Sequence, residues 1–429
     1  MSPSSPSLSD FFGSQSDDLF EKCRRLNDFV GMAKAAGIYD SQYRVTLDGP
    51  LDHRIRVENP FTGVTQEMIC FDSNSYLGLH LHPRVVAAVE RALRRVGYGT
   101  PSAQLLGGTN RYLRELEETV ADFHGRKAAI IFPSGYAANV GTLTALLRPE
   151  DLFVCDRFAH ASIQDGCRYS GARFGGAFAH ADLDDAERLL LRDAPAARGK
   201  LIVTDSVYSM HGELAPLPAL RALADRHGAR LMLDEAHSVG VLGATGRGIE
   251  EHFDMPGSID VLMGTFSKAP GSLGGYVCGG EDLIEYLRFF ARAGMFTASL
   301  PAATCAGICE ALRVMQEEPE HRLRLVQNAK QLWDGLQSAG LSVPASPSPI
   351  VPVAVGEDHV LWTVARELFD AGIKVGSVSH PAVPRGESIL RLTVNARHTD
   401  ADIERTVEVL RHVGSRHGLL SERERDQAA

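Results

Sequence analysis

Residues 264–276 read GTFSKAPGSLGGY and place one lysine, Lys268, among glycines and small hydroxylated residues. The largely apolar run before it, residues 259–263, is typical of a buried strand, so Lys268 is expected just past a strand end. Burial of an amine lowers its pKa and favours nucleophilic chemistry. An ordinary surface lysine on a glycine-rich turn is the alternative, and the stretch alone does not decide between the two.

A second apolar strand, within residues 231–238 (LMLDEAHS), ends in two acids and a histidine. Asp234 and His237 are three residues apart, so both side chains can face one bound ring. A carboxylate can pair with a protonated pyridine nitrogen and help the ring withdraw electrons from a reacting carbon, while His237 can donate to a ring oxygen. Helix capping by Asp234 is the alternative interpretation. Together with Lys268, the pattern favours a cofactor site.

Composition and charge set broad limits on the protein class. The 429 residues are 44% hydrophobic and 23% charged, which is typical of a soluble globular enzyme. The net charge of −10 and the scattered basic residues do not indicate nucleic-acid binding. No apolar stretch is long enough for a transmembrane helix, and no secretory signal is expected. The seven cysteines form no CxxC pair, which predicts reduced thiols, a cytoplasmic protein and no metal site.

The central part of the chain alternates short apolar strands with helices. This alternation predicts βαβ units, an α/β fold and a mainly parallel sheet. The expected strands lie at residues 129–132, 152–155, 201–204, 230–233, 261–265 and 275–278. The domain prediction is a disordered lead (1–18), an N-terminal helix and hairpin element (19–75), a large cofactor-binding domain (76–300), a smaller α+β C-terminal domain (301–420) and a frayed tail (421–429).

Ligands of parallel sheets bind beyond the carboxyl ends of the strands, where this chain carries polar residues. Ser134, Gly135 and Tyr136 open a helix whose amides can bind a phosphate, and Thr265 and Ser267 can add hydroxyls. A plain turn with a serine cap is the alternative at residues 133–135.

Four further residues fit the same site. His160 follows a strand and can stack on a ring, although a single histidine is more often a structural hydrogen-bonding group. Asp205 and Ser209 end another strand, and Arg391 interrupts an apolar one. A buried arginine needs an anion, either a substrate carboxylate or an internal acid. Together these residues match the needs of pyridoxal 5′-phosphate (PLP), whose aldehyde bonds a lysine and whose ring stores electrons.

From about residue 71 to residue 417 the chain resembles the α-oxoamine synthases, a family of fold-type-I PLP-dependent transferases. The group comprises serine palmitoyltransferases, 8-amino-7-oxononanoate synthases and 2-amino-3-ketobutyrate CoA ligases. Its homodimers share active sites between subunits. The resemblance is carried by residues 73–79 (SNSYLGL), 134–139 (SGYAAN), 160–162 (HAS), 207–210 (VYSM), 234–237 (DEAH), 246–248 (GRG), 265–268 (TFSK) and 296–301 (FTASLP).

The resemblance implies a role for each matching residue. Lys268 is the Schiff-base lysine, Asp234 pairs with the pyridine nitrogen, and His160 stacks on the ring. The remaining roles are a ring-oxygen contact for His237 and Ser209, a phosphate site for Ser134, Gly135, Tyr136 and Thr265, a contribution across the dimer interface for Thr297, an amino-acid carboxylate site for Arg391, and substrate contacts for Asn74 and Asp205.

The implied reaction is a decarboxylative condensation. A small amino acid (serine, alanine or glycine) displaces Lys268, whose freed amine removes the Cα proton. The resulting carbanion attacks an acyl thioester carried by CoA or a carrier protein, and loss of CO₂ leaves an α-amino ketone. A PLP-dependent aminotransferase or lyase of the same fold, or a non-catalytic partner subunit, is the alternative.

Four departures from the family pattern leave the substrate open. His211 replaces an acid, and His380 stands in a loop, residues 379–381, where related enzymes carry an arginine. Gln104 lies near a position where arginine is common, and Pro270 closely follows the lysine. The amino acid, the acyl chain length and the subfamily therefore stay undetermined at this stage.

Overall fold

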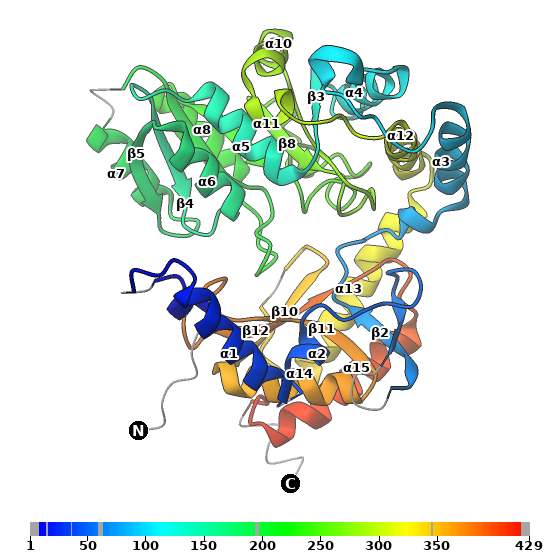
Figure 1. The fold of residues 1–429 in the computed structure, drawn as a ribbon. Helices are drawn as coiled ribbons and strands as arrows, with labels where there is room; N and C mark the ends of the chain where they lie inside the picture. The colour runs from blue at the N-terminus through cyan, green and yellow to red at the C-terminus, as the bar shows by residue number, and fades with distance from the viewer. Residues whose placement is uncertain are drawn as a thin grey trace. The chain divides into compact units, whose positions relative to one another are not determined.

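The computed structural model describes residues 8–13, 16–35, 37–58, 63–193, 197–344 and 346–421 (Figure 1). The chain divides into two compact units. The large unit comprises Asn74–Ser209 and Glu213–Leu323. The small unit comprises the described residues before Asn74, together with Met210–Gly212 and those from Arg324 onward. The expected domain boundaries differ, because they kept residues 19–75 as a separate element and placed residues 301–323 in the C-terminal domain.

The large unit contains a seven-stranded sheet in the order β3-β9-β8-β7-β6-β4-β5. Strand β9 is antiparallel to both of its neighbours, and the other neighbouring pairs are parallel. The predicted α/β fold with a mainly parallel sheet is therefore confirmed, with β5 as an additional edge strand. The strands are β3 (Ala128–Phe132), β4 (Leu152–Asp156), β5 (Arg173–Phe178), β6 (Lys200–Asp205), β7 (Arg230–Asp234), β8 (Val261–Thr265) and β9 (Gly275–Gly279).

Helices cover this sheet, so its apolar side chains are buried and stabilise it. Phe132, Val203 and Met232 belong to one core cluster and are fully buried. Burial of a side chain of this size contributes roughly 1.5–3 kcal/mol. The helical segments of the unit are η2 (Leu79–Leu81), α3 (Pro83–Val96), η3 (Gln104–Gly108), α4 (Arg111–Phe123), α5 (Gly135–Leu146), α6 (Ala161–Ser170), α7 (Leu183–Asp193), α8 (Leu217–His227), α9 (Ile249–His252), α10 (Glu281–Phe290), α11 (Arg292–Met295) and α12 (Ala302–Glu317).

The small unit is built on a five-stranded sheet in the order β1-β2-β11-β12-β10. Only the pair β2–β11 is parallel. This pairing joins the N-terminal hairpin to the C-terminal part of the chain, so the hairpin is not an independent element. The strands are β1 (Arg54–Glu58), β2 (Thr65–Phe71), β10 (Ile350–Gly356), β11 (Ile373–Val378) and β12 (Ser388–Thr393).

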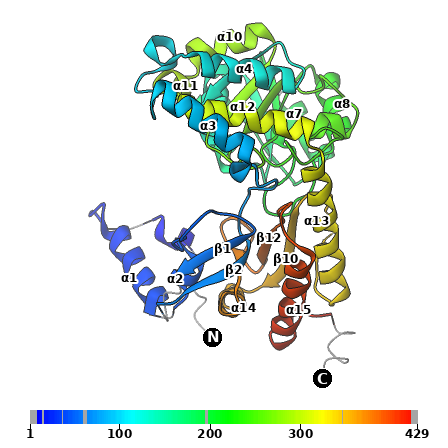
Figure 2. The same ribbon diagram turned by 90° about the vertical axis from the view of Figure 1, so that its right-hand side faces the viewer.

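Helix α14 packs against β10, β11 and β12, and α15 packs beside α14 (Figure 2). The helical segments of the unit are η1 (Leu8–Phe11), α1 (Glu21–Ala35), α2 (Tyr39–Gln42), α13 (Glu320–Ser338, from Arg324 onward), α14 (Asp358–Asp370) and α15 (Asp400–Arg416). Residues 1–7 and 14–15 of the predicted lead, residues 59–62 of the predicted hairpin element, and residues 422–429 of the predicted tail lie outside the described residues. No helix of the described residues has the length and apolar character needed to cross a membrane.

Candidate active site

A pocket of about 270 Å³ lies at the carboxyl ends of the parallel strands in the large unit. This is the edge at which parallel sheets bind ligands. It brings together Ser134, Gly135, Tyr136, His160, Ser162, Asp205, Asp234, Ala236, His237, Met263, Thr265, Ser267, Lys268, Leu273 and Gly274. The predicted residues Asn74, Ser209, Thr297 and Arg391 are not among those that line it. Arg391 belongs to the small unit, and Thr297 follows α11 in the large one.

Lys268 lies on the turn that follows β8, as the sequence predicts, and its side chain is partly buried. Its carbonyl oxygen accepts a hydrogen bond from the Gly271 amide at 2.9 Å, which closes the turn. The lysine charge acts on two neighbours in the pocket, because it lowers the pKa of both Asp205 and His160. Lys268 therefore supplies a cation and a potential nucleophile in one place.

The start of α5 forms an anion-binding site. Ser134 caps the helix by accepting a hydrogen bond from the Ala137 amide at 3.1 Å, so the serine cap considered above is present, and Gly135 and Tyr136 line the pocket beside it. A side chain at Gly135 would meet Thr265, with a Cβ placed only 3.0 Å from the Thr265 Cβ. The helix start thus lies close against β8. Exposed amides at a helix start attract anions, and phosphate fits this donor set.

Two hydroxyls extend this site. Thr265 Oγ1 donates to the Gly274 carbonyl oxygen at 2.9 Å. Because that bond uses the threonine proton, the contact of 2.9 Å between Thr265 Oγ1 and Ser267 Oγ has the serine as its donor. The chain therefore orders both hydroxyls beside the first turn of α5.

Asp234 ends β7, and only 4% of its surface is exposed. Its two oxygens accept hydrogen bonds from the Asn139 side-chain amide at 2.7 Å and from the Ala236 backbone amide at 2.9 Å. A turn follows Asp234, and the next helix, α9, begins only at Ile249, so Asp234 is not a helix cap. A buried carboxylate held in this way can pair with a cationic ring nitrogen.

His160 combines the two interpretations left open by the sequence. Its Nδ1 accepts a hydrogen bond from the Ser162 amide at 3.3 Å and thereby caps α6, while its ring lines the pocket. Partial loss of solvent around the ring lowers the pKa of His160, the Asp234 charge opposes this shift, and the Lys268 charge adds to it. His160 is therefore a neutral imidazole at neutral pH, which suits stacking.

Sequence reasoning assigned no role to three residues that contact the site residues. Asn139 and Ser162 form a hydrogen-bonded chain between Asp234 and His160, and Tyr76 Oη lies 2.5 Å from His237 Nδ1. Each belongs to a motif that carries the family resemblance. Asn139 is a polar residue in an otherwise apolar helix, which is the signal that could have found it, whereas no comparable signal marks Tyr76 or Ser162.

Gln104, one of the departures from the family pattern, has a structural contact. Its side-chain amide donates to the Ile131 carbonyl oxygen at 2.7 Å, next to the end of β3. Gln104 thus ties η3 to the sheet.

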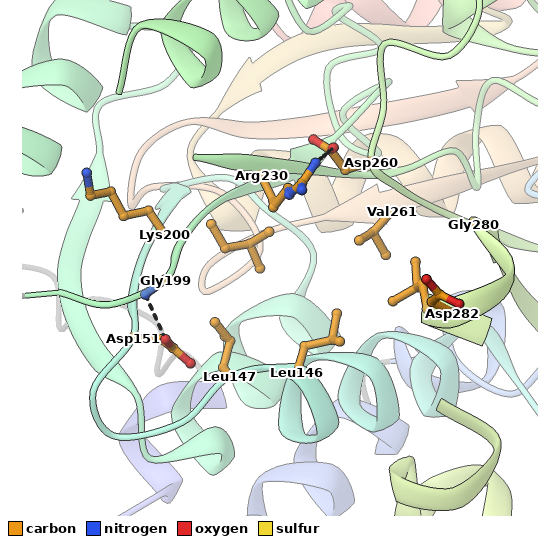
Figure 3. A pocket seen from close by; sticks show the side chains of 12 residues that line it. Leu146, Leu147, Asp151, Gly199, Lys200, Arg230, Asp260, Val261, Gly280 and Asp282 are labelled. Atoms are coloured by element: carbon orange, nitrogen blue, oxygen red, sulfur yellow. Dashed lines mark hydrogen bonds and ion pairs between the residues drawn. The ribbon is translucent and has the colours of Figure 1, made fainter. Parts of the chain in front are cut away.

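A larger cavity of about 580 Å³ lies at the amino ends of the strands, where β4, β6, β7 and β8 begin and away from the candidate active site (Figure 3). Three of the charged groups around it, Asp151, Arg230 and Asp260, have partners within the protein. Arg230 pairs with Asp260 at 2.7 Å, and the Asp151 carboxylate accepts from the Gly199 amide at 2.9 Å. The cavity contains none of the predicted site residues.

A group of potential metal ligands lies apart from the pocket. His82, Glu318 and His321 bring their ligand atoms within 4.8 Å of one another. His82 Nδ1 accepts from the Arg84 amide at 3.3 Å, and the Arg84 guanidinium donates to Glu318 at 3.0 Å. These hydrogen bonds give His82 and Glu318 a structural role, which is to stabilise the first turn of α3.

Comparison with known proteins identifies the family. A family model for aminotransferase class I and II matches residues 66–410. The chain is 39% identical over 403 residues to 4-hydroxy-2,2′-bipyrrole-5-methanol synthase PigH of Serratia sp., covering 94% of this chain but only 61% of that relative's length. It is 40% identical to an 8-amino-7-oxononanoate synthase of Bacillus velezensis, over 81% of this chain and 88% of the relative. A solved structure of serine palmitoyltransferase with a PLP internal aldimine superposes with a TM-score of 0.89 and 32% identity, over 94% of this chain and 100% of that one. The chain belongs to the class I and II aminotransferase family and, within it, to the α-oxoamine synthases.

Proposed function

We propose that this protein is a PLP-dependent α-oxoamine synthase. It condenses a small amino acid with an acyl thioester and releases CO₂ and a free thiol, which leaves an α-amino ketone. The observation that carries the proposal is one pocket that joins Lys268, Asp234, His160 and His237 to the start of α5. The relatives named above, an 8-amino-7-oxononanoate synthase and a serine palmitoyltransferase with PLP, support the same chemistry.

The residues of the pocket fit PLP. When bound, PLP supplies an aldehyde for an amine and a ring that withdraws electrons from a reacting carbon. The first turn of α5 accepts a phosphate, because Gly135 leaves no room for a side chain beside Thr265. The proposed contacts are Lys268 for the aldehyde, Asp234 for the ring nitrogen, His160 for the ring face, His237 and Ser209 for the ring oxygen, and Ser134, Gly135, Tyr136 and Thr265 for the phosphate.

Lys268 has two tasks in this proposal. Its amine is the one amine among the side chains that line the pocket, so it holds the cofactor before substrate arrives. Once the amino acid has displaced it, Nζ accepts the proton from the Cα carbon of the substrate. The Asn139 side-chain amide and the Ala236 backbone amide meanwhile hold the Asp234 carboxylate in a fixed orientation.

We assign the amino-acid contacts to three residues. Arg391 binds the substrate carboxylate, because its guanidinium offers several donors in one plane. Asn74 and Asp205 contact the amino acid in this proposal, and Asp205 is a lining residue of the pocket. By fixing the substrate's carboxylate, Arg391 also orients the bonds at Cα and so sets which of them breaks.

The active form in this proposal is a homodimer in which Thr297 contributes to the site of the other copy. Large apolar side chains on the surface of the large unit support an interface, since Tyr98 is 88%, Leu106 81% and Phe296 67% exposed. We place the enzyme in the cytoplasm, because its seven cysteines are unpaired and six of them are buried.

One assay separates this function from its alternatives. Purified protein is mixed with PLP, each of serine, alanine and glycine, and an acyl-CoA of varied chain length, and free thiol and CO₂ are measured. The expected result is release of both in equal amounts, only when amino acid and thioester are both present. Amino-group transfer to a 2-oxo acid without thiol release would indicate an aminotransferase. Failure to bind PLP, judged by the cofactor's absorbance, would indicate a non-catalytic subunit.

A further inference from the structure

The Tyr76 hydroxyl contacts a histidine of the active site from outside the pocket. Tyr76 lies in the loop before η2 and is fully buried, and its Oη is 2.5 Å from Nδ1 of His237. The His237 side chain lies in the turn after β7 and is 5% exposed. The two rings are edge to face, with centroids 6.1 Å apart. His237 lines the pocket and Tyr76 does not, so the contact with His237 links Tyr76 to the pocket.

His160 has a similar hydroxyl contact whose direction can be derived. The Asn139 side-chain NH₂ donates to Asp234 at 2.7 Å, because an ionised carboxylate only accepts. The same NH₂ donates to Ser162 Oγ at 2.9 Å. Ser162 Oγ also lies 2.7 Å from His160 Nδ1, which already accepts from the Ser162 backbone amide. The serine proton is therefore directed to Nδ1.

Each imidazole thus has a buried hydroxyl at Nδ1. A neutral imidazole carries one proton, and the hydrogen bond made by one nitrogen decides which nitrogen carries it. Donation to Nδ1 leaves the proton on Nε2, the nitrogen on the other side of the ring. With Nδ1 as the donor instead, His237 would have no Nε2 proton to give to an anionic ring oxygen.

We propose that Tyr76 and Ser162 are positioning residues, whose hydroxyls donate to Nδ1 of His237 and of His160 and hold both rings as the Nε2-protonated tautomer. The His160 tautomer follows from contacts within the chain, whereas donation from Tyr76 to His237 is the part of the proposal that the experiment decides. The use of the tautomers, donation from His237 Nε2 to the ring oxygen of the cofactor, rests on the proposed function. Tyr76 is the stronger test case, because it lies outside the pocket lining.

The chain offers a matched control for Tyr76. The Tyr276 hydroxyl lies 2.8 Å from Nε2 of His124; Tyr276 is fully buried in the large unit and His124 is partly buried. Tyr276 is in β9 and does not line the pocket. Tyr276→Phe therefore removes a second tyrosine–histidine hydrogen bond and leaves the Tyr76–His237 contact in place.

The experiment records the ring nitrogen signals of ¹⁵N-histidine-labelled enzyme, with and without PLP, and assigns His237 and His160 with His237→Gln and His160→Gln. Wild type should show an unprotonated Nδ1 and a protonated Nε2 for both residues. Tyr76→Phe should shift His237 toward the other tautomer and leave His160 unchanged. Ser162→Ala should do the reverse. Tyr276→Phe should leave both signals as in wild type.

Turnover gives a second readout. Tyr76→Phe should lower kcat about fivefold, because one oriented hydrogen bond is worth about 1 kcal/mol, and should leave KM for the amino acid nearly unchanged. A protonated Nδ1 in wild-type His237, or His237 signals that are the same in Tyr76→Phe, would overturn the proposal for Tyr76. Protein that fails to bind PLP would contradict the proposed function instead, and the nitrogen signals of that protein would still decide the tautomer.

Discussion

Asp205 and Asp234 lie directly beside each other at the ends of the paired parallel strands β6 and β7. Both are nearly fully buried. Burial raises the pKa of Asp205 well above its usual value, and the Asp234 charge raises it further. The His160 amide, which donates to Asp205 at 2.8 Å, and the Lys268 charge oppose this rise only in part. Folding therefore favours the protonated form of the Asp205 carboxyl relative to the unfolded chain.

The raised pKa of Asp205 predicts a pH-dependent difference between wild type and Asp205→Asn. Unfolded Asp205 loses its proton above about pH 4, whereas the folded state keeps the proton to a higher pH. The stability that Asp205 contributes is complete below that pH and falls by up to about 1.4 kcal/mol per pH unit toward the folded pKa. The amide side chain of the variant cannot titrate and still accepts from the His160 amide. Urea unfolding of cofactor-free protein should therefore favour the variant more at about pH 7 than at about pH 5. Parallel stability profiles would contradict a raised pKa.

Substitution of Asn139 should weaken cofactor binding. Asn139→Leu removes the amide that donates to Asp234 at 2.7 Å, and a hydrogen bond to a charged group is worth about 1.5–3 kcal/mol. We expect PLP affinity, measured by equilibrium dialysis, to fall about 10- to 150-fold. Thr142→Val is the control, because Thr142 is equally buried on α5 and its hydroxyl has no hydrogen-bond partner among the described residues. An equal loss in both variants would indicate a general packing effect.

Gly135→Ala tests the phosphate site. The new methyl group would lie 3.0 Å from Thr265 Cβ and 3.1 Å from its Oγ1, so Thr265 or the first turn of α5 must shift by a few tenths of an ångström. Such overpacking costs about 1–3 kcal/mol, and the movement widens the site where the phosphate binds. Affinity for PLP and for inorganic phosphate should fall together. Gly280→Ala at the start of α10 is the control, because its Cβ would meet no atom within 4 Å. Unchanged phosphate affinity in Gly135→Ala would place the phosphate elsewhere.

Local sequence patterns predicted the strands of the large unit and the residues at their carboxyl ends. Lys268, Asp234 and His160 could be assigned to one site because parallel strands end at the same edge of a sheet. The sequence does not contain comparable information on pairing over long distances. The parallel register of Ile69 with Ile373 joins two distant segments, and no local pattern marks it. The N-terminal hairpin was therefore expected as a separate element.

The contacts behind the pocket were missed for the same reason. Tyr76 and His237 are 161 residues apart, and a buried tyrosine in a turn looks like a core residue in the sequence. Asn139 was noticed only as part of a motif, because its partners, Ser162 and Asp234, come from two other elements. Residue type and spacing thus indicate which side chains face a ligand, whereas the hydrogen bonds that orient them depend on the folded structure.

Arg391→Ala should separate substrate binding from cofactor binding. Arg391 lies in β12 of the small unit, where its guanidinium donates to Thr393 Oγ1 at 2.9 Å. KM for the amino acid should rise by roughly 10- to 100-fold, as expected for loss of a charge-assisted contact, while PLP affinity stays close to that of wild type. Arg391→Lys should recover only part of the affinity, because lysine cannot present two parallel donors. Equal losses for amino acid and PLP would contradict the assignment.

Lys268→Ala should abolish multiple turnover and leave the fold intact. The turn keeps its hydrogen bond, since the Gly271 amide donates to the backbone oxygen of residue 268, and the thermal midpoint should stay near that of wild type. The lysine charge also lowers the pKa of Asp205 and of His160, so loss of activity in the alanine variant alone does not separate charge from nucleophile. Lys268→Arg makes that separation, because arginine keeps the charge but does not act as a nucleophile at neutral pH. We expect thiol release to be undetectable in both variants. Activity in Lys268→Arg would assign Lys268 an electrostatic role, and sustained turnover in Lys268→Ala would exclude it as the nucleophile and base.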